Sequence, residues 1–185
     1  MIDRLADLLK EAGSRGAAPV ETWNPPYCGD IGLRIARDGG WHYRGSPIGR
    51  MALVKLFARV LRHDPDGRYY LVTPAEKIDI AVEDAPFVAV QLELTGSGRE
   101  QMLMFRTNVD DVVACGAEHP LRFGLGDGDD GLKPYVHVRG RLEALVSRSL
   151  VYDLVDLAAA DDDGRTGIWS DGVFFPLPGL AGPGD

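Results

Sequence analysis

Polar and charged side chains stand beside predicted turns along this 185-residue sequence. An arginine guanidinium binds a carboxylate or phosphate through two parallel hydrogen bonds, so the arginines of this group suit an anionic ligand. If two similar units pack together, a groove forms at their junction, and such grooves are common ligand sites. The candidate ligand-binding residues are Arg44, Ser46, Arg50, Glu76, Lys77, Glu83 and Asp84 from the first part of the chain, and Thr107, Asn108, Tyr135 and Arg139 from the second.

Glu83 and Asp84 allow two interpretations. In the first, one of these carboxylates acts as a general acid or base on an anionic small molecule. In the second, one of them pairs with Arg50 or Lys77 and only joins the units, because buried charges need partners whatever their function. The sequence leaves both interpretations open.

Motifs that would assign a reaction are missing from the sequence. It contains no phosphate loop of the Gly-Lys-Ser type, no dinucleotide fingerprint and no Gly-x-Ser-x-Gly elbow. The acidic loop at 127–131 does not fit an EF-hand, since Gly131 stands where an oxygen ligand is needed and Val138 where Glu is needed. The sequence therefore predicts no catalytic residue, no metal site and no cofactor, and it leaves a hydrolase unsupported rather than excluded.

Charge and hydropathy narrow the class of protein. The formal net charge of -8 argues against broad affinity for nucleic acid. Residues 34–68 carry a local basic excess, which favours a solvated basic face over an anion site. No apolar run approaches the roughly 18 residues of a membrane span, and the N-terminus lacks a signal-peptide pattern. With only Cys28 and Cys115, we expect a cytoplasmic protein whose partner is an anionic small molecule or another protein.

Periodicity predicts the elements of the first part of the chain. Ser46 is a good N-cap and Pro47 suits the first helical position. Apolar residues then recur at spacings of three and four as far as Leu61, which predicts a long helix. The expected elements are a helix at 1–12, a hairpin at 31–36 and 41–44, the long helix from Pro47 to Leu61, and strands at 68–73 and 77–83, the last with one face in water.

Pro86 interrupts the sheet pattern, so a domain boundary is expected there. Leucines and valines at helical spacing predict a second long helix at 141–159. Further strands are expected at 88–94, 101–107, 112–115, 121–125, 135–139, 168–169 and 173–175. The predicted fold class is α+β, with two tandem related units that each pack a mostly antiparallel sheet on one long helix. The predicted division is an N-terminal helix at 1–16, a first unit at 17–85 and a second unit at 86–185.

Two short motifs recur at nearly the same offset. His42-Tyr43-Arg44-Gly45 returns as His137-Val138-Arg139-Gly140, and Asp66-Gly67-Arg68 returns as Asp163-Gly164-Arg165. This recurrence favours an internal duplication over the independent use of Gly and Asp in turns. It would make Arg44 and Arg139 equivalent, and we expect at least one of them to have a carboxylate partner inside its own unit.

A set of short segments resembles a bacterial family of uncharacterised proteins, domain-of-unknown-function family 1285, from about Asp30 to Leu177. The segments are Gly45-Ser46-Pro47-Ile48, Leu71-Val72-Thr73-Pro74, Glu76-Lys77, Val82-Glu83-Asp84-Ala85-Pro86-Phe87, Thr107-Asn108, Pro134-Tyr135 with Val138-Arg139, and Phe174-Phe175-Pro176-Leu177. The resemblance implies two related α+β units, the second superficially like a pleckstrin-homology fold, with a binding site between them and a role in signal transduction. It supplies no catalytic residues.

Three function classes follow. The leading hypothesis is a cytosolic ligand-binding or interaction protein with its site in the groove between two duplicated units. The alternative is an enzyme that acts on an anionic small molecule with Glu83 or Asp84 as acid or base. A structural adaptor would instead present an apolar surface patch and no pocket.

Overall fold

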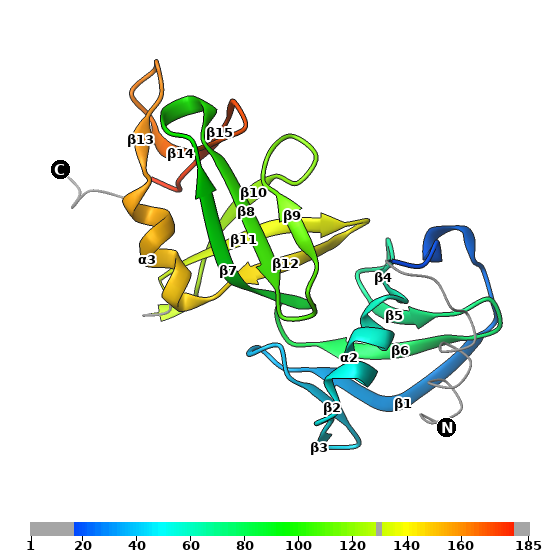
Figure 1. The fold of residues 1–185 in the computed structure, drawn as a ribbon. Helices are drawn as coiled ribbons and strands as arrows, with labels where there is room; N and C mark the ends of the chain where they lie inside the picture. Colours follow the sequence, from blue (N-terminus) through cyan, green and yellow to red (C-terminus); the bar gives the residue numbers. More distant parts are fainter. Residues whose placement is uncertain (1–16, 129–130, 180–185) are drawn as a thin grey trace. The chain divides into compact units, whose positions relative to one another are not determined.

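The computed structural model describes residues 17–128 and 131–179, which fall into two units. Grouping by contacts places the chain up to Pro86, with Gly140–Leu142, in the first unit. Phe87–Arg139 and the chain from Glu143 form the second unit. Figure 1 shows that each unit is built mainly of strands. The helix predicted at 1–12, and with it the N-terminal segment 1–16, lies outside the described residues.

From residue 17 onward, the first unit is one six-stranded sheet with one α-helix over one face (Figure 1). The strands lie in the order β3-β2-β1-β6-β5-β4. The central neighbours β1 and β6 run parallel, and the other neighbours run antiparallel. The elements are η1 (Val20–Thr22), β1 (Tyr27–Ile35), β2 (Trp41–Tyr43), β3 (Ser46–Pro47), α2 (Met51–Ala58), β4 (Leu61–His63), β5 (Tyr69–Val72) and β6 (Lys77–Val82).

The core of this unit lies between helix α2 and the sheet. Phe57 of α2 is fully buried and stacks on Trp41 of β2, with ring centroids 6.3 Å apart. Ile35, Leu71 and Ile78 on three other strands are also buried. Each such side chain contributes about 1.5–3 kcal/mol by leaving water, which fixes which face of the sheet is apolar.

The long helix predicted from Pro47 to Leu61 is wrong at both ends. Arg44 and Gly45 have φ values of 49° and 82°, a left-handed turn that folds Ser46–Pro47 back onto β2 as strand β3. The helix therefore begins only at Met51 and is eight residues long. Leu61 pairs with Leu71 in the sheet, because an apolar residue at helical spacing also fits a buried strand.

The second unit also contains a six-stranded sheet, in the order β10-β11-β12-β7-β8-β9, followed by a helix and a three-stranded sheet, β13-β14-β15. Its central neighbours β12 and β7 run parallel. The elements are β7 (Phe87–Thr95), η2 (Gly98–Glu100), β8 (Met102–Thr107), β9 (Val112–Ala114), β10 (Leu121–Leu125), β11 (Leu132–Arg139), β12 (Leu142–Val146), α3 (Arg148–Asp156), β13 (Ala159–Ala160), β14 (Thr166–Ser170) and β15 (Val173–Pro176).

The helix predicted at 141–159 is in fact a strand and a shorter helix. Leu142, Ala144 and Val146 are buried on alternate positions, the period of a strand, and the last two pair with β7. Helix α3 then covers nine residues from Arg148. The fold is thus β-rich with two short α-helices among the described residues, and the prediction of one long helix per unit is wrong.

The two sheets share one topology. If the six strands of each sheet are numbered in chain order, both sheets read 3-2-1-6-5-4. The predicted motif repeat does not follow this equivalence. Arg44 comes after the second strand of its sheet, whereas Arg139 ends the fifth strand of the other. The two arginines are therefore not equivalent, and the matching motifs reflect similar turns.

Within residues 17–128 and 131–179, no helix is both long enough and apolar enough to cross a bilayer.

Candidate functional site

A row of polar side chains crosses the face of the first sheet that α2 does not cover. Arg62 pairs with Tyr70, Tyr70 with Asp79, and Asp79 with Asp30, on four neighbouring strands. Residues directly opposite each other on paired strands project to the same face, so these four side chains form a row. Ile78, a neighbour of Asp79 in sequence, projects to the other face, into the core.

Two glycines give strand β1 the shape that this row needs. The register between β1 and β6 shifts twice, between Tyr27 and Asp30 and between Asp30 and Leu33. Gly29 and Gly32 lie within these two intervals and have φ values of 87° and 85°. Such left-handed positions are typical of bulges and favour glycine.

Asp79 is the buried centre of the row, with 8% of its surface exposed. Arg68 Nη2 donates a hydrogen bond to Asp79 Oδ2 over 2.7 Å, and the Tyr27 hydroxyl donates to the same oxygen. The bond to Asp79 raises the pKa of Tyr27, and burial adds to that effect. A carboxylate this deeply buried needs such partners, so both fix its position.

A buried cluster of three charged side chains lies at the Arg62 end of the row. Arg62 Nε and Nη2 donate to the two carboxylate oxygens of Asp64 over 2.5 and 3.1 Å. Lys77 Nζ adds a third bond, to Asp64 Oδ2, over 2.6 Å. Burial alone would raise the pKa of Asp64, but the bonds from Arg62 and Lys77 outweigh burial and lower it.

Arg62 and Lys77 also have contacts beyond Asp64. Arg62 Nη1 donates to the backbone oxygens of Val20 and Trp23, each over 2.8 Å, which holds residues 20–23 on the sheet. The Lys77 ammonium lies 3.9 Å from the centroid of the Tyr70 ring. Lys77 is one of the predicted ligand-binding residues, and its described contacts are with Asp64 and Tyr70 of the same unit.

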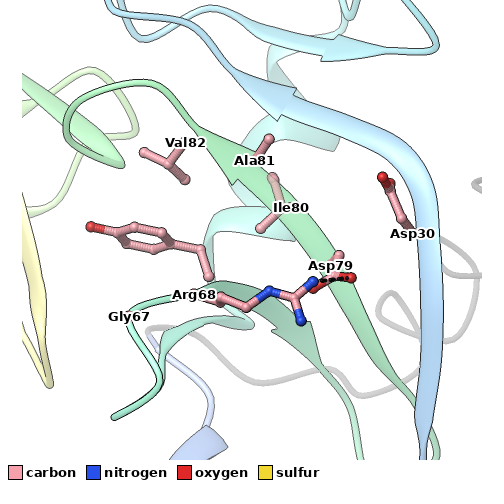
Figure 2. A pocket seen from close by; sticks show the side chains of 8 residues that line it. Asp30, Gly67, Arg68, Asp79, Ile80, Ala81 and Val82 are labelled. Atoms are coloured by element: carbon pink, nitrogen blue, oxygen red, sulfur yellow. Dashed lines mark hydrogen bonds and ion pairs between the residues drawn. The ribbon is translucent and has the colours of Figure 1, made fainter.

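A pocket of about 330 Å³ opens beside Asp79. Figure 2 shows Arg68 and Asp79 on one side of strand β6 and Asp30 on the neighbouring strand. The lining residues come from β1, the β4–β5 turn, β5 and β6, and are Asp30, Gly67, Arg68, Tyr69, Asp79, Ile80, Ala81 and Val82.

The pocket offers one cationic and one anionic group to a ligand. The Arg68 side chain is 56% exposed, and its bond to Asp79 uses one of the five guanidinium N–H donors. Asp30 is exposed, and its Oδ1 accepts a hydrogen bond from the Gly32 backbone over 2.7 Å. Asp79 is buried and already accepts hydrogen bonds from Tyr27 and Arg68.

None of the eleven predicted ligand-binding residues lines this pocket. Three of those in the first unit, Arg44, Ser46 and Arg50, are exposed around strand β3 and the start of α2. Glu76 belongs to a turn in which its backbone N–H donates to Thr73 Oγ1 over 3.0 Å. Arg44, Ser46 and Arg50 are thus surface residues of the first unit, and Glu76 is a turn residue.

Glu83 is an exposed residue that is hydrogen-bonded to strand β1 and to the residues that follow it. Arg34 Nη1 donates to Glu83 Oε1 over 2.7 Å, and the Arg37 backbone donates to Oε2 over 3.1 Å. Asp84 follows it in a bend after β6. The expected partners of a carboxylate here were Arg50 or Lys77, whereas the observed partner of Glu83 is Arg34, a residue of the same unit.

In the second unit the predicted residues stabilise turns. Thr107 Oγ1 accepts a bond from the Asp111 backbone over 3.1 Å, and Arg139 Nη1 donates to Asp111 Oδ2 over 2.6 Å. Asn108 Oδ1 accepts a bond from the Val88 backbone over 3.0 Å. The prediction that Arg139 has a carboxylate partner in its own unit is confirmed.

Tyr135 is buried, and the Arg122 guanidinium lies 4.2 Å from the centroid of its ring. Tyr135 lies in the same strand as Arg139, but the arginine that contacts its ring is Arg122. The structure therefore brings together Thr107 and Arg139 through Asp111, and places Tyr135 elsewhere in strand β11.

The pocket residues were missed in the sequence, although two signals pointed to them. Asp79 and Ala81 occupy the polar side of the alternation in residues 77–83. Arg68 belongs to the Asp66-Gly67-Arg68 turn, which drew attention only as a possible repeat. Asp30 had no signal, because its position depends on the bulge in β1.

These features define a class of protein with two tandem β-rich units and a polar pocket on the first sheet. The chain belongs to the DUF1285 family, as the sequence motifs predicted. The "Domain of unknown function (DUF1285), N-terminal domain" matches residues 18–85, and the "Protein of unknown function (DUF1285), C-terminal domain" matches residues 86–177.

Two solved structures are similar to this chain. A DUF1285 family protein from Silicibacter pomeroyi DSS-3 is 48% identical, with a TM-score of 0.87, over 94% of this chain and 93% of that chain. A DUF1285 family protein from Shewanella baltica OS155 is 26% identical, with a TM-score of 0.52, over 68% of this chain and 91% of that chain. No curated protein matches the chain.

Proposed function

We propose that this protein binds a small molecule in the pocket of its first unit and acts as a ligand-binding or interaction protein. The observation that carries the proposal is the pocket itself, where an exposed guanidinium and an exposed carboxylate flank strand β6. Its walls are preorganised, since Asp79 is held by two donors and the Arg62–Asp64–Lys77 cluster fixes the adjoining strands.

The geometry of Glu83 adds no support to the enzyme alternative. Its two carboxylate oxygens accept bonds from Arg34 and the Arg37 backbone, and it does not line the pocket. A general acid or base must reach the proton that it transfers, and Glu83 is committed to strand β1 instead. The broader prediction of a site at the junction of the two units, formed by the eleven residues, stays a prediction.

The proposal includes the duplication and the signalling role implied by the family resemblance. The shared strand order 3-2-1-6-5-4 supports duplication of a six-stranded unit. Helix α3, which follows the last strand of the second six-stranded sheet, supports the superficial likeness of that unit to a pleckstrin-homology fold. In a signalling role the bound molecule would be sensed rather than converted, in keeping with a binding site that lacks a recognised catalytic motif.

An NMR screen of the full chain against small polar molecules tests the binding function. We expect hits to shift the amide resonances of residues 67–69 and 79–82. Ala81→Leu fills the pocket from an exposed alanine of β6 and should abolish these shifts. Ala114→Leu, at an exposed alanine of β9 outside the pocket, is the matched control and should keep them. Hits that map elsewhere, or persist in Ala81→Leu, would overturn the proposal.

A further inference from the structure

We infer that the ligand of this pocket is a small zwitterion, whose anionic group binds Arg68 and whose ammonium group binds Asp30. The inference rests on the proposed binding function and names the ligand class. Arg68 directly precedes β5 and Asp30 lies in β1, and β6 lies between these two strands in the sheet (Figure 2). A ligand that contacts both must therefore carry its two charges at opposite ends.

The anionic end is assigned by the geometry of Arg68. Its Nη2 is bonded to Asp79, which orients the planar guanidinium, while more than half of the side chain stays open to solvent. The remaining N–H donors can hold a carboxylate or a phosphate in the bidentate manner that lysine does not offer. Asp79 thus acts as a positioning residue for Arg68.

The cationic end is assigned by Asp30. Its described bond comes from the Gly32 backbone, a neutral donor, so no cationic side chain pairs with this carboxylate among the described contacts. Asp79 differs, because one N–H of Arg68 donates a hydrogen bond to it. An ammonium group has three donors and can bond Asp30 while it completes its shell with water at the open side of the pocket.

The remaining lining suits a short carbon chain between the two charges. Ile80, Ala81 and Val82 form the strand that separates Arg68 from Asp30, and the exposed Ala81 methyl leaves room above it. A purely anionic ligand would face Asp30, and a purely cationic ligand would face Arg68. In either case, like charges would lie close together in the pocket, which disfavours binding. A molecule that carries both charges therefore fits best.

Isothermal titration of the full chain with matched probes tests this ligand class. The zwitterions are phosphoethanolamine and β-alanine, and the fragments are inorganic phosphate, propionate and ethanolamine. We expect a zwitterion to bind at least about tenfold more tightly than either of its fragments, because each charged end adds a hydrogen-bonded contact. The preference between the two zwitterions distinguishes a phosphate from a carboxylate at Arg68.

Variants assign the two ends. Arg68→Gln should lower zwitterion affinity to that of ethanolamine, and Asp30→Asn should lower it to that of the anionic fragment. Arg122→Gln is a control, since Arg122 is equally exposed, pairs with a carboxylate over 2.7 Å and lies over a tyrosine. Asp38→Asn is the second control, since Asp38 also accepts a bond from the backbone two residues ahead. Arg68→Lys retains the positive charge at this position. It checks that a loss of zwitterion affinity in Arg68→Gln is not caused by misfolding.

The outcomes separate this inference from the proposed function. Equal affinities for zwitterion and fragment, or unchanged binding in Arg68→Gln and Asp30→Asn, would overturn the ligand class. If zwitterions fail while other molecules shift residues 79–82 and lose that effect in Ala81→Leu, the ligand class is wrong and the binding function stands. If no molecule maps to the pocket, both are overturned.

Discussion

The two six-stranded sheets have the same strand order but differ in what they carry at their centre. In the first unit the central parallel pair places Asp30 opposite Asp79, with register shifts on either side of Asp30. In the second unit the corresponding pair places Ala144 opposite Phe87 and continues without a shift. The topology is thus compatible with either a polar or an apolar centre, and the local sequence decides which forms.

Charge separates the two units further. Residues 17–85 have nine basic and nine acidic residues, whereas residues 86–185 have eight basic and sixteen acidic ones, so the net charge of -8 resides in the second part. The ion pairs also differ in burial. The Arg62–Asp64 pair in the first unit is nearly buried, while the Arg122–Glu143 pair in the second is largely exposed. Removing one partner of a buried pair costs more stability than removing one partner of an exposed pair.

Loss of the buried cluster should have the largest effect. Arg62→Ala removes two bonds to Asp64 and the side-chain bonds to the Val20 and Trp23 backbone oxygens. We expect the free energy of unfolding to fall by about 3–5 kcal/mol in urea denaturation. Arg122→Ala, at an exposed pair of the second unit, should cost at most about 1 kcal/mol. Equal losses for the two variants would show that burial does not distinguish the two units.

The bulge in β1 gives the next effect. Gly32 has a φ of 85°, and a Cβ placed there would lie 3.1 Å from Arg44 Cγ. Gly32→Ala should therefore cost about 1–2 kcal/mol of stability and displace Asp30 from the pocket. Gly49→Ala meets no atom within 4 Å and has no positive φ, so its midpoint in urea should stay unchanged. An unaffected Gly32→Ala would mean that β1 does not need its left-handed residue.

A smaller effect is expected from acid. The pKa of Asp64 in the folded chain lies below its ordinary value of 3.8. The carboxylate therefore stabilises the fold above that pH, and this contribution is lost as the pH falls through the lowered pKa. Urea midpoints at pH 7 and pH 3 should differ more for the natural chain than for Asp64→Asn. If Asp64→Asn showed the same pH dependence as the natural chain, Asp64 would not be the source of the acid sensitivity.

The smallest effect on stability is expected from thiol modification, which compares the units directly. Cys28 in β1 is exposed, whereas Cys115 is fully buried in the second unit, and burial raises its pKa to about 12. A disulfide reagent at pH 8 should modify one thiol per chain quickly and the other only after unfolding. Two thiols that react at one rate would show that the second unit opens readily. Cys28→Ser should remove the fast phase alone.

The sequence predicted much of the fold where periodicity and turn residues agree. The hairpin around Asp38, the strands at 68–73 and 77–83 and the final hairpin are all observed near the predicted residues. The helices were overestimated, because Leu61 and Leu142 satisfy helical spacing and strand alternation equally well. The strand conformation is selected over the helix only by pairing with another strand, which is β5 for the segment of Leu61 and β7 for the segment of Leu142.

The candidate site was harder to predict than the fold. Arg68 and Asp79 are 11 residues apart, but Asp30 joins them from a strand whose register depends on two bulges. Turn motifs highlighted arginines with recognisable neighbours, such as Arg44 and Arg139, although their side chains serve local contacts. A site built across parallel neighbours leaves no spacing rule in the sequence, so its residues emerge only once the sheet is assembled.

The parallel pairing of the first and last strands of the first sheet has a consequence for how the chain acquires its structure during synthesis. Tyr27 meets Lys77 and Ile35 meets Val82, so the centre of the sheet joins segments about fifty residues apart. At a ribosomal rate of about 5–20 residues per second, β1 is complete several seconds before its partner leaves the tunnel. During that interval one edge of β1 carries unpaired backbone groups that can associate with other chains. The charged side chains Asp30 and Arg34 along this nascent edge oppose such association until β6 arrives.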